Sequence, residues 1–268
     1  MAKYKKKRAR ELQHDRFRDA TMSYLDQLGN LLEGRGRTIL YGLGGIILAG
    51  LLVLFFVKWN NRKNDEARQA LGRAITITTT AVSPSPLPGS TEATFSSERE
   101  RAERAIAEFE KVAAKYGDPY KSESLYFIAS NRLIVDRQKG ISELTQLSSN
   151  GNGEVAALSK FALAQANESD GKYDDAVRLY TELAKLNSPT VTPETANLRL
   201  AKVYEKQGKK KEAADLLFNI VDAARKAKGA DNQSLPQSTA AREAADELQK
   251  LDPDRYAQLP PEIPSLAG

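Results

Sequence analysis

An uncharged, apolar run at residues 38–57 constrains this chain more than any other feature of its sequence. At a rise of about 1.5 Å per residue, a helix of this length spans roughly 30 Å, the thickness of a bilayer's hydrocarbon core. Arg37 precedes the run and Lys58 and Trp59 follow it, as expected of side chains at headgroup level. A cleaved signal peptide would have a shorter run and a small-residue cleavage site after it. The sequence therefore predicts one transmembrane helix at residues 39–57.

The distribution of basic residues predicts the orientation of this helix. Residues 1–38 hold ten Lys or Arg and five Asp or Glu, so they account for the whole net charge of +5. Only five basic residues follow the run within residues 58–73. Because basic flanks stay in the cytoplasm, the N-terminus should be cytoplasmic and the larger C-terminal part periplasmic, in the inner membrane of a bacterium. The opposite orientation, with the C-terminal part serving as a cytosolic import receptor, stays open.

The same distribution bears on partners. A basic excess confined to a short tail indicates membrane topology rather than a nucleic-acid-binding face, so the expected partner is the lipid bilayer and not nucleic acid.

Within the predicted span, Gly42, Gly45 and Ala49 lie on one helix face. Small residues let a second helix approach closely, which makes these three the candidate helix-contact residues.

Composition argues against catalysis. The chain has no Cys and one His, His14, which stands in the polar N-terminal tail. Thiolate chemistry, Cys-ligated metals and His-based triads are therefore excluded from the rest of the chain. Asp170 and Gly171 resemble part of a calcium loop, but the outer ligand positions hold Ala166 and Val177. We expect no enzyme, cofactor, metal or small-molecule substrate, and an enzyme using carboxylates alone is the remaining catalytic alternative.

Beyond residue 97 the sequence has a helical period with an internal repeat. Small residues recur twelve positions apart in successive helices, as Ala164 with Ala176 and Ala201 with Ala213. A glycine, Gly171 or Gly208, precedes each second member by five residues, and the period is 37. Ala129 and Ile141 keep the same interval in a degenerate unit, residues 121–147. Such spacing favours stacked helix pairs over a generic helical bundle.

These positions resemble the tetratricopeptide repeat. The two best units match it at Leu163, Ala164, Gly171, Tyr173, Ala176 and Tyr180, and at Leu200, Ala201, Tyr204, Gly208, Ala213 and Leu217. Lys160 and Asn197 stand where the family usually has Trp. Upstream, Ser97 and Glu100 form a capping box for a helix reaching Tyr116. Its Ala105 and Phe109 look like the second helix of an earlier pair.

The predicted fold class is all-α, a single N-terminal transmembrane helix followed by a tetratricopeptide-like helical-repeat (α-solenoid) domain. Residues 237–251 give a last amphipathic helix that could cap it. The predicted segments are a basic cytoplasmic tail with an amphipathic helix (1–38), the transmembrane helix (39–57), a juxtamembrane helix (58–75), a Ser/Thr/Pro-rich linker (76–97), the repeat domain (98–251) and a C-terminal tail (252–268).

The resemblance implies that the first helices of the pairs line a surface that binds a peptide or a protein. The positions that match the family's groove are Tyr126, Ser130, Phe161, Gln165, Glu168, Leu198, Lys202 and Glu205.

The whole layout, from basic tail to helical repeats, resembles the ancillary subunit of the bacterial Sec translocon. That resemblance implies a periplasmic chaperone or scaffold whose partners are the Sec translocon, periplasmic chaperones or exported chains. The alternative is a structural accessory subunit of a larger membrane or envelope complex.

Overall fold

The computed structural model describes residues 36–83, 94–150, 153–186, 188–229, 233 and 235–262, and the side chains of residues 36–49 and 150 lie outside this description. His14 and the amphipathic helix predicted at residues 17–32 lie outside the described residues. The helix-contact candidates Gly42, Gly45 and Ala49 have a helical backbone, but their side chains lie outside the description. The chain divides between Asp65 and Glu66 into two units.

Helix α3 (Gly36–Thr79) is continuous through the predicted transmembrane and juxtamembrane segments. Among the described residues, no helix has both the length and the apolar character needed to cross a bilayer. Of the predicted span, residues 39–49 belong to the stretch without described side chains. Residues 76–79, expected at the start of the linker, are helical.

The C-terminal part of α3 is the missing first helix of the earliest pair. It runs antiparallel to α4 (Glu98–Lys115), since Glu66 pairs with Lys115 at 3.6 Å and the Thr80 carbonyl accepts from Arg101 at 3.2 Å. Leu71 and Ala74 are buried with Phe109 of α4 in one apolar cluster. The folded domain thus begins near Glu66 rather than at residue 98. Because the outer face of this helix is polar, its short row of buried apolar residues was not recognised in the sequence.

The start of α4 confirms the predicted cap with one change. The Ser97 side chain accepts from the Glu100 backbone N–H at 3.1 Å. The Glu100 carboxylate, in turn, accepts from the backbone N–H of Ser96 at 2.9 Å, one residue before the expected partner. Just before it, Val82 and Phe95 form an isolated parallel bridge.

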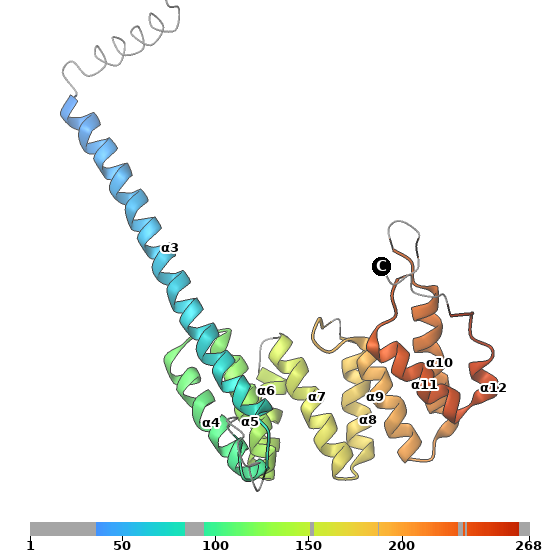
Figure 1. Cartoon of the computed structure of the whole chain (residues 1–268). Helices are drawn as coiled ribbons and strands as arrows, with labels where there is room; N and C mark the ends of the chain where they lie inside the picture. Colours follow the sequence, from blue (N-terminus) through green and yellow to red (C-terminus); the bar gives the residue numbers. More distant parts are fainter. Residues whose placement is uncertain are drawn as a thin grey trace, which may run out of the picture. The chain divides into compact units, whose positions relative to one another are not determined.

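The remaining helices follow one another side by side (Figure 1). Three further helix pairs follow, each with a short turn between its two helices, and two more helices end the described domain. Their bounds are α5 (Tyr120–Val135), α6 (Arg137–Asn150), α7 (Gly153–Ser169), α8 (Tyr173–Ala184), α9 (Pro193–Lys206), α10 (Lys210–Lys226), α11 (Thr239–Leu251) and α12 (Pro253–Tyr256). This is an all-α helical-repeat fold resembling the tetratricopeptide repeat.

The repeat residues of the two best units pack as predicted. Ala164 and Ala176, like Ala201 and Ala213, are completely buried between the helices of their pair. Gly171 and Gly208 have φ values of 71° and 75°, the left-handed conformation that glycine adopts without steric cost. The 37-residue repeat therefore sets both the helix contacts and the turns.

The degenerate unit differs from the prediction at its second helix. Only Asp136 separates α5 from α6, whereas three residues separate the helices of the later pairs. The small residue at the helix contact is consequently Gly140 and not Ile141. A Cβ on Gly140 would lie 2.7 Å from the Leu133 nitrogen and 3.0 Å from the Ala129 oxygen. A shorter turn has moved the contact by one residue.

The C-terminal end is more ordered than expected. Helix α11 begins at Thr239, two residues after the predicted start, and Ser238 caps it. Leu259, in the segment predicted to be a C-terminal tail, is buried with Leu248 of α11. Arg225 of α10 donates to the Pro260 carbonyl at 2.5 Å.

Candidate protein-interaction surfaces

The predicted groove residues of α5 and α7 are partly covered by their own chain. Tyr126 and Ser130 are half-buried on α5, and burial raises the pKa of the Tyr126 phenol. On α7, the Phe161 ring packs edge-on against Tyr180 with centroids 5.8 Å apart. Among the eight predicted groove residues, all of which the structure describes, Gln165 alone is exposed.

Glu168, the third groove candidate of α7, ties three helices together. Its carboxylate accepts from the buried Tyr180 hydroxyl of α8 at 3.2 Å and from Lys206 of α9 at 2.6 Å. Burial, followed by the negative charge of Glu168, raises the pKa of Tyr180. The geometry gives Glu168 a role in positioning neighbouring helices.

The groove candidates of α9 are covered by α11. Leu198 is only 3% exposed and belongs to the core that α11 completes, so the prediction that it lines an open groove is wrong. Lys202 pairs with Glu243 of α11 at 2.5 Å. Burial, and then the charge of Glu247, raises the pKa of Glu205. The sequence predicted α11 as a cap but could not indicate which face of α9 it would cover.

Two hollows that the sequence did not predict lie at equivalent places in successive pairs. Each is enclosed by the second helix of one pair and both helices of the next. The α4–α6 hollow, of about 460 Å³, is lined by Glu110, Ala113, Leu125, Ile128, Arg132, Glu143, Gln146 and Leu147. The α6–α8 hollow, of about 450 Å³, is lined by Ile141, Thr145, Ser148, Ser149, Lys160, Leu163, Asn167, Asp175, Arg178, Leu179 and Glu182.

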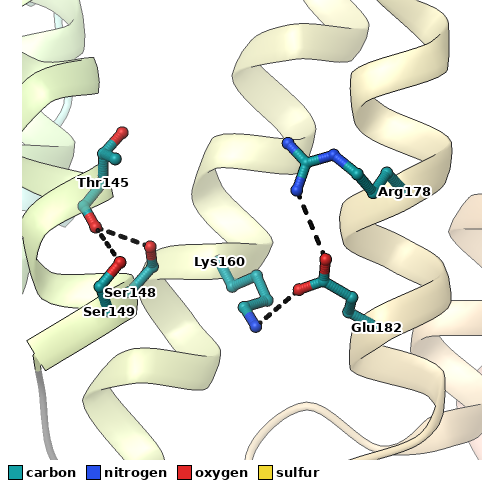
Figure 2. Close-up of polar contacts among 6 residues, drawn as sticks. All are labelled: Thr145, Ser148, Ser149, Lys160, Arg178 and Glu182. Atoms are coloured by element: carbon teal, nitrogen blue, oxygen red, sulfur yellow. Dashed lines mark hydrogen bonds and ion pairs between the residues drawn. The ribbon is translucent and has the colours of Figure 1, made fainter.

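The α6–α8 hollow has mainly polar walls. Figure 2 shows Ser148 and Ser149 of α6 turned toward the Thr145 carbonyl, while Lys160 of α7 reaches Glu182 of α8. Lys160 donates to Glu182 at 2.8 Å and thereby lowers the pKa of that carboxyl. Ser148 and Ser149 donate to the Thr145 carbonyl at 2.8 and 3.2 Å. Most donors here are already satisfied within the chain.

The α4–α6 hollow has a more apolar character. Ala113, Leu125, Ile128 and Leu147 supply its apolar walls. Arg132 lines it and pairs with Glu110 of α4 at 2.9 Å and with Glu143 of α6.

The two hollows share one sequence feature. Ala129, Ala164 and Ala201 occupy the same place in their first helices, and each is completely buried. Four residues before them stand Leu125, Lys160 and Asn197, the positions where the family usually has Trp. Leu125 lines the α4–α6 hollow and Lys160 lines the α6–α8 hollow. Among the described residues, no cluster of His, Asp and Glu could hold a metal ion.

Comparisons with known proteins find similarity only among solved structures. One is a set of nearly identical TPR-like repeats of a Podosopora anserina protein assigned as a kinesin light chain, at 16% identity and a TM-score of 0.47, covering 69% of this chain and 85% of that one. A single-substitution variant of it gives 16% identity and a TM-score of 0.48, covering 69% and 84%. No known family profile and no curated protein matches the chain.

Proposed function

We propose that this chain is a membrane-anchored protein-interaction module of the bacterial inner membrane. Its N-terminus is cytoplasmic, and its repeat domain works in the periplasm as a chaperone or scaffold beside the protein-export translocon. The observation that carries the anchoring is the apolar stretch of α3, and the one that carries protein binding is the row of helix pairs that follows.

The apolar stretch of α3 favours surroundings other than water. The side chains from Leu51 to Val57 are each between 48% and 71% exposed, and consecutive positions cover every side of a helix. A helix that is apolar all round is stable when lipid or protein covers it. Lys63 lies 5.3 Å from the Trp59 ring, an arrangement suited to the headgroup region.

Membrane extraction tests the anchor. The wild-type chain should stay with membranes in an alkaline carbonate wash, whereas a Phe55→Asp, Phe56→Asp variant should be released. Gly72→Asp, on the exposed side of the same helix, is the matched control and should remain bound. Release of the wild type would contradict anchoring.

Protease treatment tests the orientation. In spheroplasts, added protease should digest the domain from Glu66 onward and leave the N-terminal tail intact. Protection of the domain would place it in the cytosol and overturn the proposed localisation.

Photocrosslinking tests the partners. Because Leu198 is buried, a photoreactive residue belongs at the exposed Gln165, with exposed Lys211 of α10 as the control position. Crosslinks from residue 165 to translocon subunits, periplasmic chaperones or exporting chains, absent from residue 211, would support the proposal. Crosslinks only to unrelated proteins would refute it.

The covered state of the predicted groove favours a second candidate, a structural accessory subunit of a larger membrane complex. Leu198 lies under α11, and Glu168 and Lys202 are paired within the chain, which leaves little of that surface for a mobile peptide. A fixed partner could instead use the exposed faces of the pairs. Stoichiometric co-purification with one complex, whether or not export is active, would distinguish this candidate from a chaperone.

A further inference from the structure

The α4–α6 hollow is lined by Arg132, which stands at a position where another pair of the same chain has an aromatic residue. Arg132 stands three residues after Ala129, and Tyr204 stands three residues after the equivalent Ala201. The Tyr204 ring is partly buried and packs against the apolar clusters on both sides of it. At α5 this position holds Arg132 instead of a ring, and a hollow of about 460 Å³ lies beside it.

The walls of the hollow suit a ring. Ala113, Leu125, Ile128 and Leu147 give it apolar sides, and Leu125 is 37% exposed whereas the other three are half-buried or buried. Covering such a surface with an aromatic side chain removes a large apolar area from water. Aromatic anchors in pockets of this kind carry much of the energy of protein interfaces.

Arg132 provides a flat surface on one side of the hollow. Its side chain is 18% exposed, and carboxylates from two different helices, Glu110 and Glu143, hold the guanidinium from both sides. A guanidinium fixed in this way keeps its planar face available for stacking on a ring. The chain forms such contacts elsewhere, with Arg255 lying 5.2 Å from the Phe218 ring and Arg225 lying 5.5 Å from the Tyr256 ring.

The charges around the hollow indicate what should flank the ring. Two carboxylates, Glu110 and Glu143, face a single cation, Arg132, so the lining carries one net negative charge. Glu110 is 53% exposed and has an oxygen to offer in addition to the one that binds Arg132. Complementarity therefore favours a basic side chain beside the ring.

We propose that the α4–α6 hollow binds an aromatic side chain of a partner protein, flanked in the partner's sequence by Lys or Arg, with the ring stacked on the Arg132 guanidinium. This inference rests on the proposed role in protein binding and names the partner chemistry for one surface. It concerns a different surface from the crosslinking position Gln165, so the two can fail separately.

A fluorine-labelled peptide tests the hollow directly. The probe is acetyl-Lys-(5-fluoro-Trp)-Lys-amide, followed by ¹⁹F NMR in the presence of the full chain in detergent micelles, with empty micelles as the reference. The label is observed without background from Trp59. We expect saturable line broadening with a dissociation constant in the millimolar range, because one anchor in a preformed hollow is a weak ligand.

Three variants assign the binding to named groups. Arg132→Lys keeps the charge and loses the planar face, and should weaken binding about threefold to tenfold. Glu110→Gln should weaken binding of the Lys-containing probe but not of acetyl-Ser-(5-fluoro-Trp)-Ser-amide. Arg104→Lys, on α4 and paired with Glu108 outside the hollow, is the matched control and should bind like the wild type.

Each other outcome overturns the inference. Broadening no greater than in empty micelles, or equal broadening with wild type and Arg132→Lys, would show that the hollow is not a ring site. An equal effect of Glu110→Gln on both probes would contradict the proposal that Lys or Arg flanks the ring. If the chain is a dimer that the probe dissociates, the ring belongs to a second copy and the assignment to another protein is wrong.

Discussion

At the scale of single residues, one small side chain in each helix decides how closely a pair can pack. In the later pairs these are alanines, such as Ala164 and Ala176, which are completely buried. In the degenerate pair the contact is tighter and uses Gly140, whose α-carbon faces the backbone of α5. The pair with the shorter turn therefore has glycine at the helix contact, and the pairs with longer turns have alanine. The two residues differ by one methyl group.

Replacing Gly140 with Ala should destabilise the protein although alanine favours helices. The added Cβ would lie 2.7 Å from the Leu133 nitrogen, and the backbone cannot move away without separating the helices. We expect a loss of about 1–3 kcal/mol in the free energy of unfolding, measured by urea titration with circular dichroism. Gly72→Ala, where a Cβ meets nothing within 4 Å, should gain up to ~1 kcal/mol. Equal stability of the two variants would contradict the close approach at Gly140.

Replacing Gly208 with Ala tests a backbone effect in isolation. The residue has a φ of 75°, and a Cβ there would meet no atom within 4 Å, so no packing change accompanies the substitution. The left-handed conformation should cost alanine about 1–2 kcal/mol, and Gly208→Asn should cost less. A thermal melt that ranks Gly, then Asn, then Ala would agree; an alanine variant as stable as the wild type would not.

At the scale of the elements, the sequence predicted well where the helices lie along the chain, but it predicted poorly which helices pack against one another. The pairs α7/α8 and α9/α10 follow directly from the 37-residue spacing, because it repeats contacts within and between adjacent pairs. The role of α3 was missed, since its buried stripe of Ala67, Leu71 and Ala74 is short within a polar segment. The burial of Leu198 was missed because it depends on α11, more than forty residues away.

The contact between α9 and α11 should respond to pH through two carboxyls with opposite shifts. Burial and Glu247 raise the pKa of Glu205 above its ordinary value of 4.5, so the native state holds this proton more tightly than the unfolded state. Stability from this group is present at low pH and is lost as the pH rises above 4.5. The Lys202 ammonium, by its hydrogen bond, lowers the pKa of Glu243, whose contribution is present above 4.5 and is lost as the pH falls below it.

Two glutamine variants separate these contributions. Glu205→Gln should be more stable than the wild type at pH 7.5, and this advantage should disappear at pH 4. Glu243→Gln should be less stable at pH 7.5, and its deficit should shrink at low pH as the wild-type carboxyl is protonated. Urea midpoints at both pH values measure the effects, and changes of the same sign in the two variants would contradict the opposite shifts.

At the scale of the whole molecule, the domain from Glu66 onward is a series of helix pairs, each packed against the next, without one central core. Its apolar clusters succeed each other along the chain, from Leu71 and Phe109 at one end to Leu248 and Leu259 at the other. In such a series, stability is close to a sum of contributions from each pair and from each interface between pairs. A defect at one end should therefore weaken its neighbours and leave distant pairs intact.

Replacing Leu71 with Ala tests this, together with the assignment of α3 to the first pair. Leu71 is buried against α4, and its truncation should cost about 2–5 kcal/mol. Because that loss falls on the first cluster, hydrogen exchange followed by mass spectrometry should show faster exchange in α4 and α5 and unchanged protection in α9 to α11. Exposed Leu235→Ala is the control and should change none of them. Uniform loss of protection along all the helices would mean that the domain unfolds as a single unit, and unchanged exchange in α4 would mean that α3 is not part of the first pair.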